Sequence, residues 1–167
     1  MHSPRHWRER LTEKPMLVLA FAVTALTAAL ATPERSDSMD IGEGIIRKAS
    51  PRSVPETLDR LEAILKTKGV QVFARIDHSG DATKVGLSMP PTQVLVFGNP
   101  RAGTPVMLAA PTSAIDLPLK ALAWQDSAGK VWLGYTDPQY FARRYGLTEK
   151  QVAPLGVIAD LVDAAVK

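Results

Sequence analysis

The chain of 167 residues contains no cysteine. This absence excludes disulfide bonds, thiolate catalysis and the common structural zinc sites. Histidine is also scarce, because His2 and His6 lie in the first ten residues and only His78 follows them. No serine stands in a G-x-S-x-G context, which excludes a serine hydrolase of the usual form. If the protein is exported without disulfides, packing alone must hold it together.

An excess of charge is lacking as well. The whole chain carries a formal net charge of +3. Residues 1–31 hold four basic and two acidic residues, so sixteen Lys and Arg face fifteen Asp and Glu in the remainder, a net charge of +1. Nucleic-acid binding needs a clustered basic surface, so this class of partner is not expected.

The first 31 residues have the pattern of a secretory signal peptide. Four basic residues between positions 5 and 14 precede an apolar run, residues 16–31, that ends in Ala29-Leu30-Ala31. This pattern predicts cleavage after Ala31 and a periplasmic or secreted protein. The alternative is an uncleaved membrane anchor, although 16 residues fall short of the roughly 20 that span a bilayer. A membrane association is expected only if the segment is kept.

Residues 32–41 are polar and show no apolar period, which predicts a flexible tether. A single domain is then expected over residues 42–167. Within it, Ser53 and Glu56 have the spacing of a capping box, and Gly69 is a natural helix end. Leu58, Leu61, Ile64 and Leu65 share one face of the helix predicted between these signals.

Five strands are expected, near residues 44–50, 70–77 and 93–97 and on either side of a turn at residues 126–129. The run at 93–97 is apolar throughout, which is typical of a strand covered on both faces at the centre of a sheet. Thr104 before Pro105, Asp137 before Pro138, and Thr148 each predict the start of a helix. The order predicts an α/β or α+β domain, a two-layer sandwich with a mixed five-stranded sheet and packing helices.

One loop invites a comparison with phosphate-binding loops. In "VFGNPRAGTP", residues 96–105, two glycines are spaced as in GxxxxGK[ST], but Thr104 and Pro105 replace the lysine and the hydroxyl residue. Nucleotide hydrolysis is therefore not expected. Two interpretations remain open. A helix N-terminus with Arg101 would hold a small anion or carboxylate, whereas a plain turn would use Asn99 to bind the local backbone.

Several motifs together, "FARIDH", "VLVFGNPRAGTPVM", "LPLKALAW" and "VWLGY", resemble a bacterial family known as domain of unknown function 302. The resemblance covers residues 42 to about 146. It implies a compact α/β sandwich-like domain that pairs as a homodimer, and it implies no activity. The segment after His78, "SGDATKVG", departs from the alanine-rich helix expected there, which leaves the surroundings of His78 undefined.

The candidate site residues are those of a shallow pocket for a small anionic or polar ligand: His78, Asn99, Arg101, Thr104 and Asp116. His78 has the chemistry of a proton donor or acceptor. Its neighbour Asp77 is a poor partner, since adjacent strand residues point to opposite faces. Asp116 either caps backbone donors or faces a ligand with Lys120.

Three functions remain open at this stage. The first is a non-enzymatic, exported binding module, and the second is an enzyme that uses His78 in acid/base chemistry. The third is a dimeric protein-binding module, for which exposure of Trp124 or Trp132 would be the sign. No cofactor is expected. No metal is expected either, because His78, Met89 and Met107 do not form a chelating motif.

Overall fold

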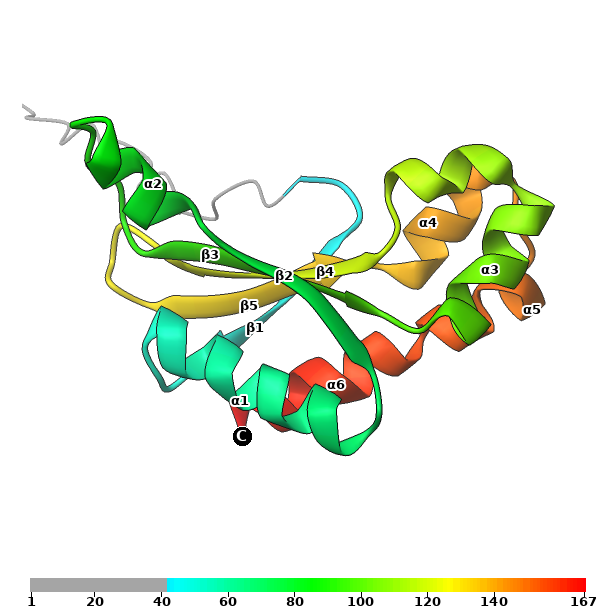
Figure 1. Ribbon diagram of the computed structural model, residues 1–167, viewed down its shortest axis with the longest axis horizontal. Helices are drawn as coiled ribbons and strands as arrows, with labels where there is room; N and C mark the ends of the chain where they lie inside the picture. The colour runs from blue at the N-terminus through cyan, green and yellow to red at the C-terminus, as the bar shows by residue number, and fades with distance from the viewer. Residues whose placement is uncertain (1–41) are drawn as a thin grey trace, which may run out of the picture. The chain divides into compact units, whose positions relative to one another are not determined.

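A five-stranded antiparallel sheet organises the domain (Figure 1). The computed structural model describes residues 42–167; the predicted signal peptide and tether, residues 1–41, lie outside the described residues. The strands are β1 (Ile45–Ser50), β2 (Gln71–Asp77), β3 (Thr92–Gly98), β4 (Leu119–Gln125) and β5 (Val131–Thr136). Their order across the sheet is β1-β5-β4-β3-β2. The expected α+β fold with five strands is confirmed.

Two details of the expected sheet are wrong. Every neighbouring pair is antiparallel, so the sheet is not mixed. The helical crossover between β1 and β2 joins strands of the same direction, but these two lie on opposite edges and never pair. The central strand is β4 rather than β3, which lies between β4 and the edge strand β2.

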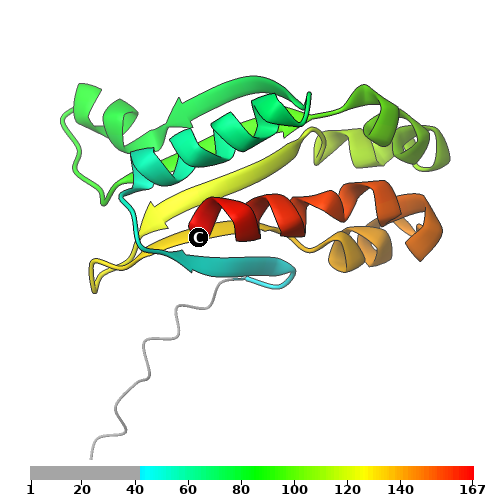
Figure 2. The same ribbon diagram turned by 90° about the horizontal axis from the view of Figure 1, so that it is seen from below.

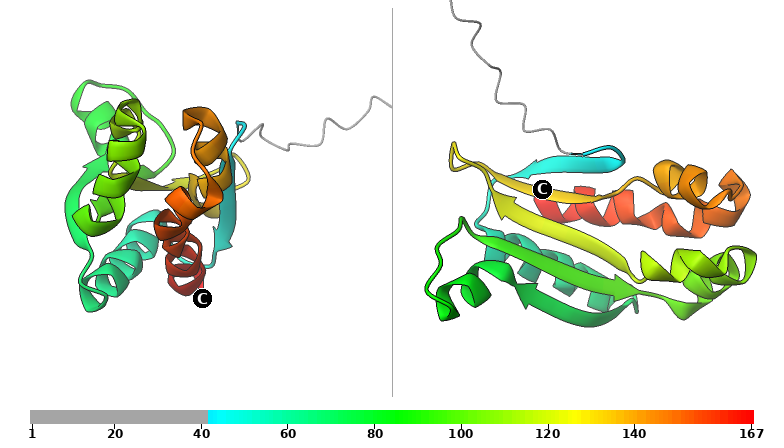
Figure 3. Two further views of the ribbon diagram at one scale, coloured as in Figure 1. Left: turned by 90° about the vertical axis from the view of Figure 1, so that its right-hand side faces the viewer. Right: turned by 90° about the horizontal axis from the view of Figure 1, so that it is seen from above.

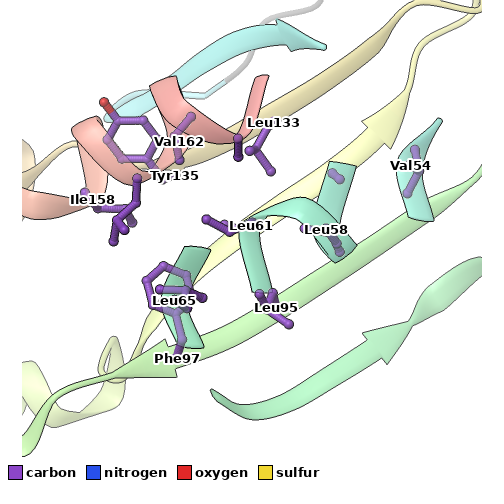
Figure 4. Packing of buried hydrophobic residues seen from close by; sticks show 14 of the residues in the cluster. Val54, Leu58, Leu61, Leu65, Leu95, Phe97, Leu133, Tyr135, Ile158 and Val162 are labelled. Atoms are coloured by element: carbon purple, nitrogen blue, oxygen red, sulfur yellow. The ribbon is translucent and has the colours of Figure 1, made fainter. Parts of the chain in front are cut away.

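Two helices cover one face of the sheet, as Figures 2 and 4 show. They are α1 (Val54–Thr67) and α6 (Val157–Val166), which contact each other and the strands beneath them. The expected start of α1 is confirmed: the Ser53 hydroxyl accepts from the Glu56 amide, and Glu56 accepts from the Ser53 amide at 3.0 Å. The main core lies here, and its largest fully buried members are Leu58, Leu61, Leu65, Leu95, Phe97, Leu133, Ile158 and Leu161.

The remaining helices gather at the two ends of the sheet (Figures 1 and 3). One end carries only α2 (His78–Lys84). The other carries α3 (Pro100–Ala109), the 3-10 turn η1 (Pro111–Ile115), α4 (Pro138–Tyr145), α5 (Glu149–Val152) and the 3-10 turn η2 (Ala153–Leu155). A second apolar cluster holds this end together: Val106, Phe141, Ala142, Val152 and Leu155.

The start of α3 differs from the prediction. The helix begins at Pro100, with Asn99 as its N-cap, so Thr104 is an interior helical residue and Pro105 lies inside the helix. Asn99 followed by Pro100 offers the same cap and first-turn chemistry as Thr104 followed by Pro105, and it stands earlier in the chain. The predicted start of α4 at Asp137 is confirmed, and its end at Gly146 has the left-handed φ of 64°.

Candidate functional site

No helix within residues 42–167 covers the second face of the sheet (Figure 1). We call this surface the open face. Its members alternate along the strands with the core residues and are Ile45, Arg47, Ile76, Val94, Val96, Lys120, Leu122, Trp124, Trp132, Gly134 and Thr136. A hollow of about 850 Å³ lies on it, lined centrally by Val94, Leu122 and Gly134. Ile76 and Leu122 remain 39% and 37% exposed, so apolar side chains of the open face are accessible to solvent.

Trp124, near the end of β4, lies on the open face and packs against Gly134. A Cβ atom built on Gly134 would stand 2.9 and 3.2 Å from two ring atoms of Trp124. Such distances are closer than carbon atoms pack, so the absence of a side chain at position 134 makes room for the indole. The ring therefore rests on the backbone of β5, and it forms one wall of the hollow.

Trp132 is fixed by polar contacts rather than by burial. Its indole Nε1–H donates to Asp126 Oδ2 at 2.8 Å. The Arg47 guanidinium and the Lys130 ammonium lie 4.1 and 4.2 Å from the ring centroid, a cation–π arrangement. The hydrogen bond from Trp132 lowers the pKa of Asp126, helped by the amides of Lys130 and Ala128. The orientation of this half-buried indole is thus determined by three charged neighbours.

His78 lies at the α2 end of the hollow and is exposed. Its neighbour Asp77 is the N-cap of α2, where it accepts from the Ser79 hydroxyl at 2.6 Å and the Gly80 amide at 2.9 Å. These two hydrogen bonds lower the pKa of Asp77. Asp77 is therefore occupied in a local cap, which agrees with the expectation that it does not orient His78.

Asp116 lies at the opposite end of the hollow. It accepts a hydrogen bond from the Tyr145 hydroxyl, which raises the pKa of Tyr145, and it forms an ion pair with Arg144 Nε at 3.3 Å. His78 follows Asp77, which pairs with Gln93 near the start of β3, whereas Asp116 precedes β4, whose first residue Leu119 pairs with Phe97 near the end of β3. The structure therefore does not bring His78 and Asp116 together as an acid/base pair.

The loop after β3 has the geometry of a capped turn. Asn99 Oδ1 accepts from the Arg101 amide at 2.9 Å, and the Asn99 carbonyl accepts from the amides of Ala102 and Gly103 at 2.9 and 3.0 Å. The amide donors that an anion would use at these three positions already have acceptors. Of the two interpretations left open by the sequence, the arrangement favours the turn.

A second cavity, of about 180 Å³, lies beside this loop, and its apolar lining was not expected from the sequence. We call it the apolar pocket. Asn99 and Thr104 line it, whereas Arg101 does not. Its walls come from β2, β3, α3, η2 and α6 and from the segment before β4. Because these segments are far apart in the chain, no local pattern signals the pocket. Four of the five predicted site residues are thus divided between two cavities, and the fifth, Arg101, lines neither.

Residues 42–167 contain no cluster of three or more metal-ligating His, Asp or Glu side chains. Nor does this part of the chain include a helix with the length and hydropathy needed to cross a membrane.

The family described as "Domain of unknown function DUF302" matches residues 46–165. The chain belongs to the DUF302 family. A solved DUF302 protein from Bacillus stearothermophilus superposes with a TM-score of 0.63 at 20% identity, covering 75% of this chain and 97% of that protein. At this identity the likeness shows the fold alone.

Two curated relatives of this DUF302 chain are longer proteins. It is 45% identical over 107 residues to "Fluoride-specific ion channel FluC 1" of Brucella suis biovar 1 (strain 1330), which is 64% of this chain and 42% of the relative. The protein of the same name from Brucella abortus biovar 1 (strain 9-941) matches over the same length, 40% of its own chain. The chain therefore spans about two-fifths of the curated relatives it matches.

Proposed function

We propose that this DUF302 domain is a non-catalytic binding module that uses its open face to dock a membrane channel for small anions. The observation that carries the proposal is the position of Trp124, a large, half-buried apolar side chain that packs against Gly134 and lines an uncovered hollow. Apolar surface that is contiguous and uncovered is typical of an interaction site. Tryptophan is also enriched among the residues that dominate binding energy.

The choice of a channel as partner comes from the Brucella relatives. In them a stretch similar to this chain forms part of a longer protein that is named a fluoride-specific ion channel. A domain joined to a channel in one protein is suited to contact a channel in a related protein. The signal peptide predicted over residues 1–31 belongs to this proposal, because export would deliver the domain to the outer side of the membrane that holds such a channel.

Acid/base catalysis by His78 is the weaker alternative. A catalytic base is normally oriented by a second group. Neither carboxylate considered for this role is available: Asp77 caps α2, and Asp116 pairs with Tyr145 and Arg144. Hydrogen bonds at helix caps lower the pKa values of Glu56 and Asp77, and the hydrogen bond from Trp132 lowers that of Asp126. A carboxyl group that exchanges protons near neutral pH needs a raised pKa instead.

The test compares two leucine variants. Leu122 lies in the hollow of the open face, whereas Leu108 is 78% exposed on α3 and lines neither cavity. The wild-type chain, Leu122→Asp and Leu108→Asp are mixed with a detergent-solubilised fluoride channel from the same bacterium and analysed by size-exclusion chromatography. We expect the wild type and Leu108→Asp to co-elute with the channel and Leu122→Asp to elute alone.

Two results would contradict the proposal. Co-elution that both variants retain would remove the open face from the interaction, and the absence of any complex would remove the channel. The mass of each chain alone is measured in the same experiment. A dimer that dissociates only in Leu122→Asp would assign the open face to self-association, the homodimer expected from the family resemblance, in place of the channel.

A further inference from the structure

The apolar pocket lies between the two hydrophobic clusters of the domain. Its floor includes Phe97 and Leu161 from the main core and Leu155 from the second cluster, all at most 2% exposed. Its rim includes Phe73 and Val157, which are 47% and 44% exposed. A cavity with a buried floor and an exposed apolar rim is accessible from solvent. A ligand that filled it would contact both hydrophobic clusters.

The chemistry of the lining is uniform. None of its sixteen residues carries a charge, and only Asn99 and Thr104 have hydrogen-bonding side chains. The Asn99 side-chain carbonyl already accepts from the Arg101 amide. A charged ligand would lose its hydration here without gaining a counter-charge, at a large cost in free energy. An uncharged apolar ligand meets no such penalty.

From these observations we infer that the apolar pocket binds a compact, uncharged molecule with about the size of one aromatic ring. The volume of about 180 Å³ supports this size. An apolar protein cavity of about 150 Å³ lined by aliphatic and aromatic side chains stays dry and takes up benzene. The ligand class is therefore the opposite of the anion that the loop sequence suggested. The inference does not depend on the open face, because the pocket lies on the side of the sheet that α6 covers.

Two alanines of α3 provide matched variants. Ala102 is half-buried and lines the pocket, whereas Ala109 is exposed on the same helix and does not line it. In Ala102→Phe the new ring has the size of the proposed ligand and competes for the same space. Ala109→Phe adds the same ring to the same helix outside the pocket. Val157→Trp, at the rim, is a second obstructing variant that introduces no change in α3.

The probes are toluene and benzoate, which share a ring and differ in charge. The ¹⁵N-labelled full chain is titrated with each, and amide shifts are followed by NMR. We expect toluene to cause saturable shifts centred on residues 97–107 and 154–161, and benzoate to cause none there. Ala102→Phe should weaken toluene binding by about tenfold or more, which corresponds to about 1.4 kcal/mol. Ala109→Phe should leave the affinity unchanged.

Three results would overturn the inference. Toluene shifts that do not saturate or that spread over the surface would show that the pocket has no specific occupant. Saturable binding of benzoate in preference to toluene would reverse the ligand class. Equal toluene affinity in Ala109→Phe, Ala102→Phe and Val157→Trp would place the bound toluene elsewhere. If Ala102→Phe does not give a dispersed spectrum, the comparison of Val157→Trp with the wild type decides alone.

Discussion

The two faces of the sheet are made by alternate residues of the same strands, yet different kinds of side chain pack on them. On β5, Leu133 points into the core beneath the helices and has no exposed surface, whereas the next open-face residue, Gly134, supports the ring of Trp124. The covered face is filled with aliphatic side chains from α1 and α6. The open face instead has large aromatic rings held in place by a glycine, a carboxylate and two cations.

The covered face therefore contains apolar surface that stabilises the domain, whereas the open face contains apolar surface that is accessible for binding. Burial of a leucine contributes to stability only as far as water is removed from it. The leucines of the covered face meet this condition, and Leu122 on the open face meets it only in part. Stability and binding are therefore expected to respond to different sets of residues in the same strands.

The largest effect is expected on the covered face. Leu133→Ala should lower the free energy of unfolding by about 2–5 kcal/mol, because it leaves a cavity in a closed core. Leu122→Ala, on the neighbouring strand, should cost less than about 1.5 kcal/mol because the side chain is already accessible to water. Urea denaturation of both variants measures the difference. Equal losses would show that a partner copy or ligand buries the open face under the conditions of the measurement.

The next effect concerns the position of Trp124. Gly134→Ala should destabilise the domain by about 1–3 kcal/mol, since the added methyl group overlaps the indole and forces it to move. Trp124→Leu in the same chain should recover part of this loss by removing the ring atoms that clash. Urea denaturation of the two single variants and the double variant gives the coupling energy. Additive losses would mean that the methyl group and the ring do not meet.

A smaller effect is expected from the helix that covers the main core. Ser53→Ala removes the cap of α1 and should lower the stability by about 1 kcal/mol. Thr148→Ala removes the same kind of capping box from α5, which has four residues and does not cover the sheet, and should cost less. Thermal unfolding of the two variants provides the comparison. A larger loss for Thr148→Ala would indicate that the end of the sheet carrying α5 contributes more to the stability of the domain than the start of α1.

The sequence predicts those parts of the domain whose signals are local. The capping box at Ser53 and the helix starts at Asp137 and Thr148 depend on residues within a few positions of one another, and the structure confirms them. Where two equivalent signals compete, as Asn99-Pro100 and Thr104-Pro105 do, the sequence offers no basis for the choice.

Features that depend on distant segments were not predicted. The apolar run of β3 suggested cover on both faces, but an apolar pattern does not reveal whether the cover comes from the same chain. Leu95 meets α1, whereas Val94 faces the open hollow. The apolar pocket needs β2, α3 and α6 together, so it appears only once the fold is known. The sequence analysis places the candidate site residues in one pocket because of their chemistry, whereas the fold places them in different parts of the domain.

The smallest effect tests how the open face holds Trp132. The hydrogen bond from the indole lowers the pKa of Asp126 in the folded chain, so its stabilising contribution is present above the carboxyl pKa of the unfolded chain and is lost as pH falls through the folded value. The Nε1–H resonance of Trp132 should therefore shift with a midpoint below the ordinary carboxyl pKa. Asp126→Asn should abolish this titration, and Asp81→Asn, on α2, should preserve it. A midpoint at or above the ordinary value would mean that the carboxylate does not hold the ring. The orientation of Trp132 would then depend on Arg47 and Lys130 alone.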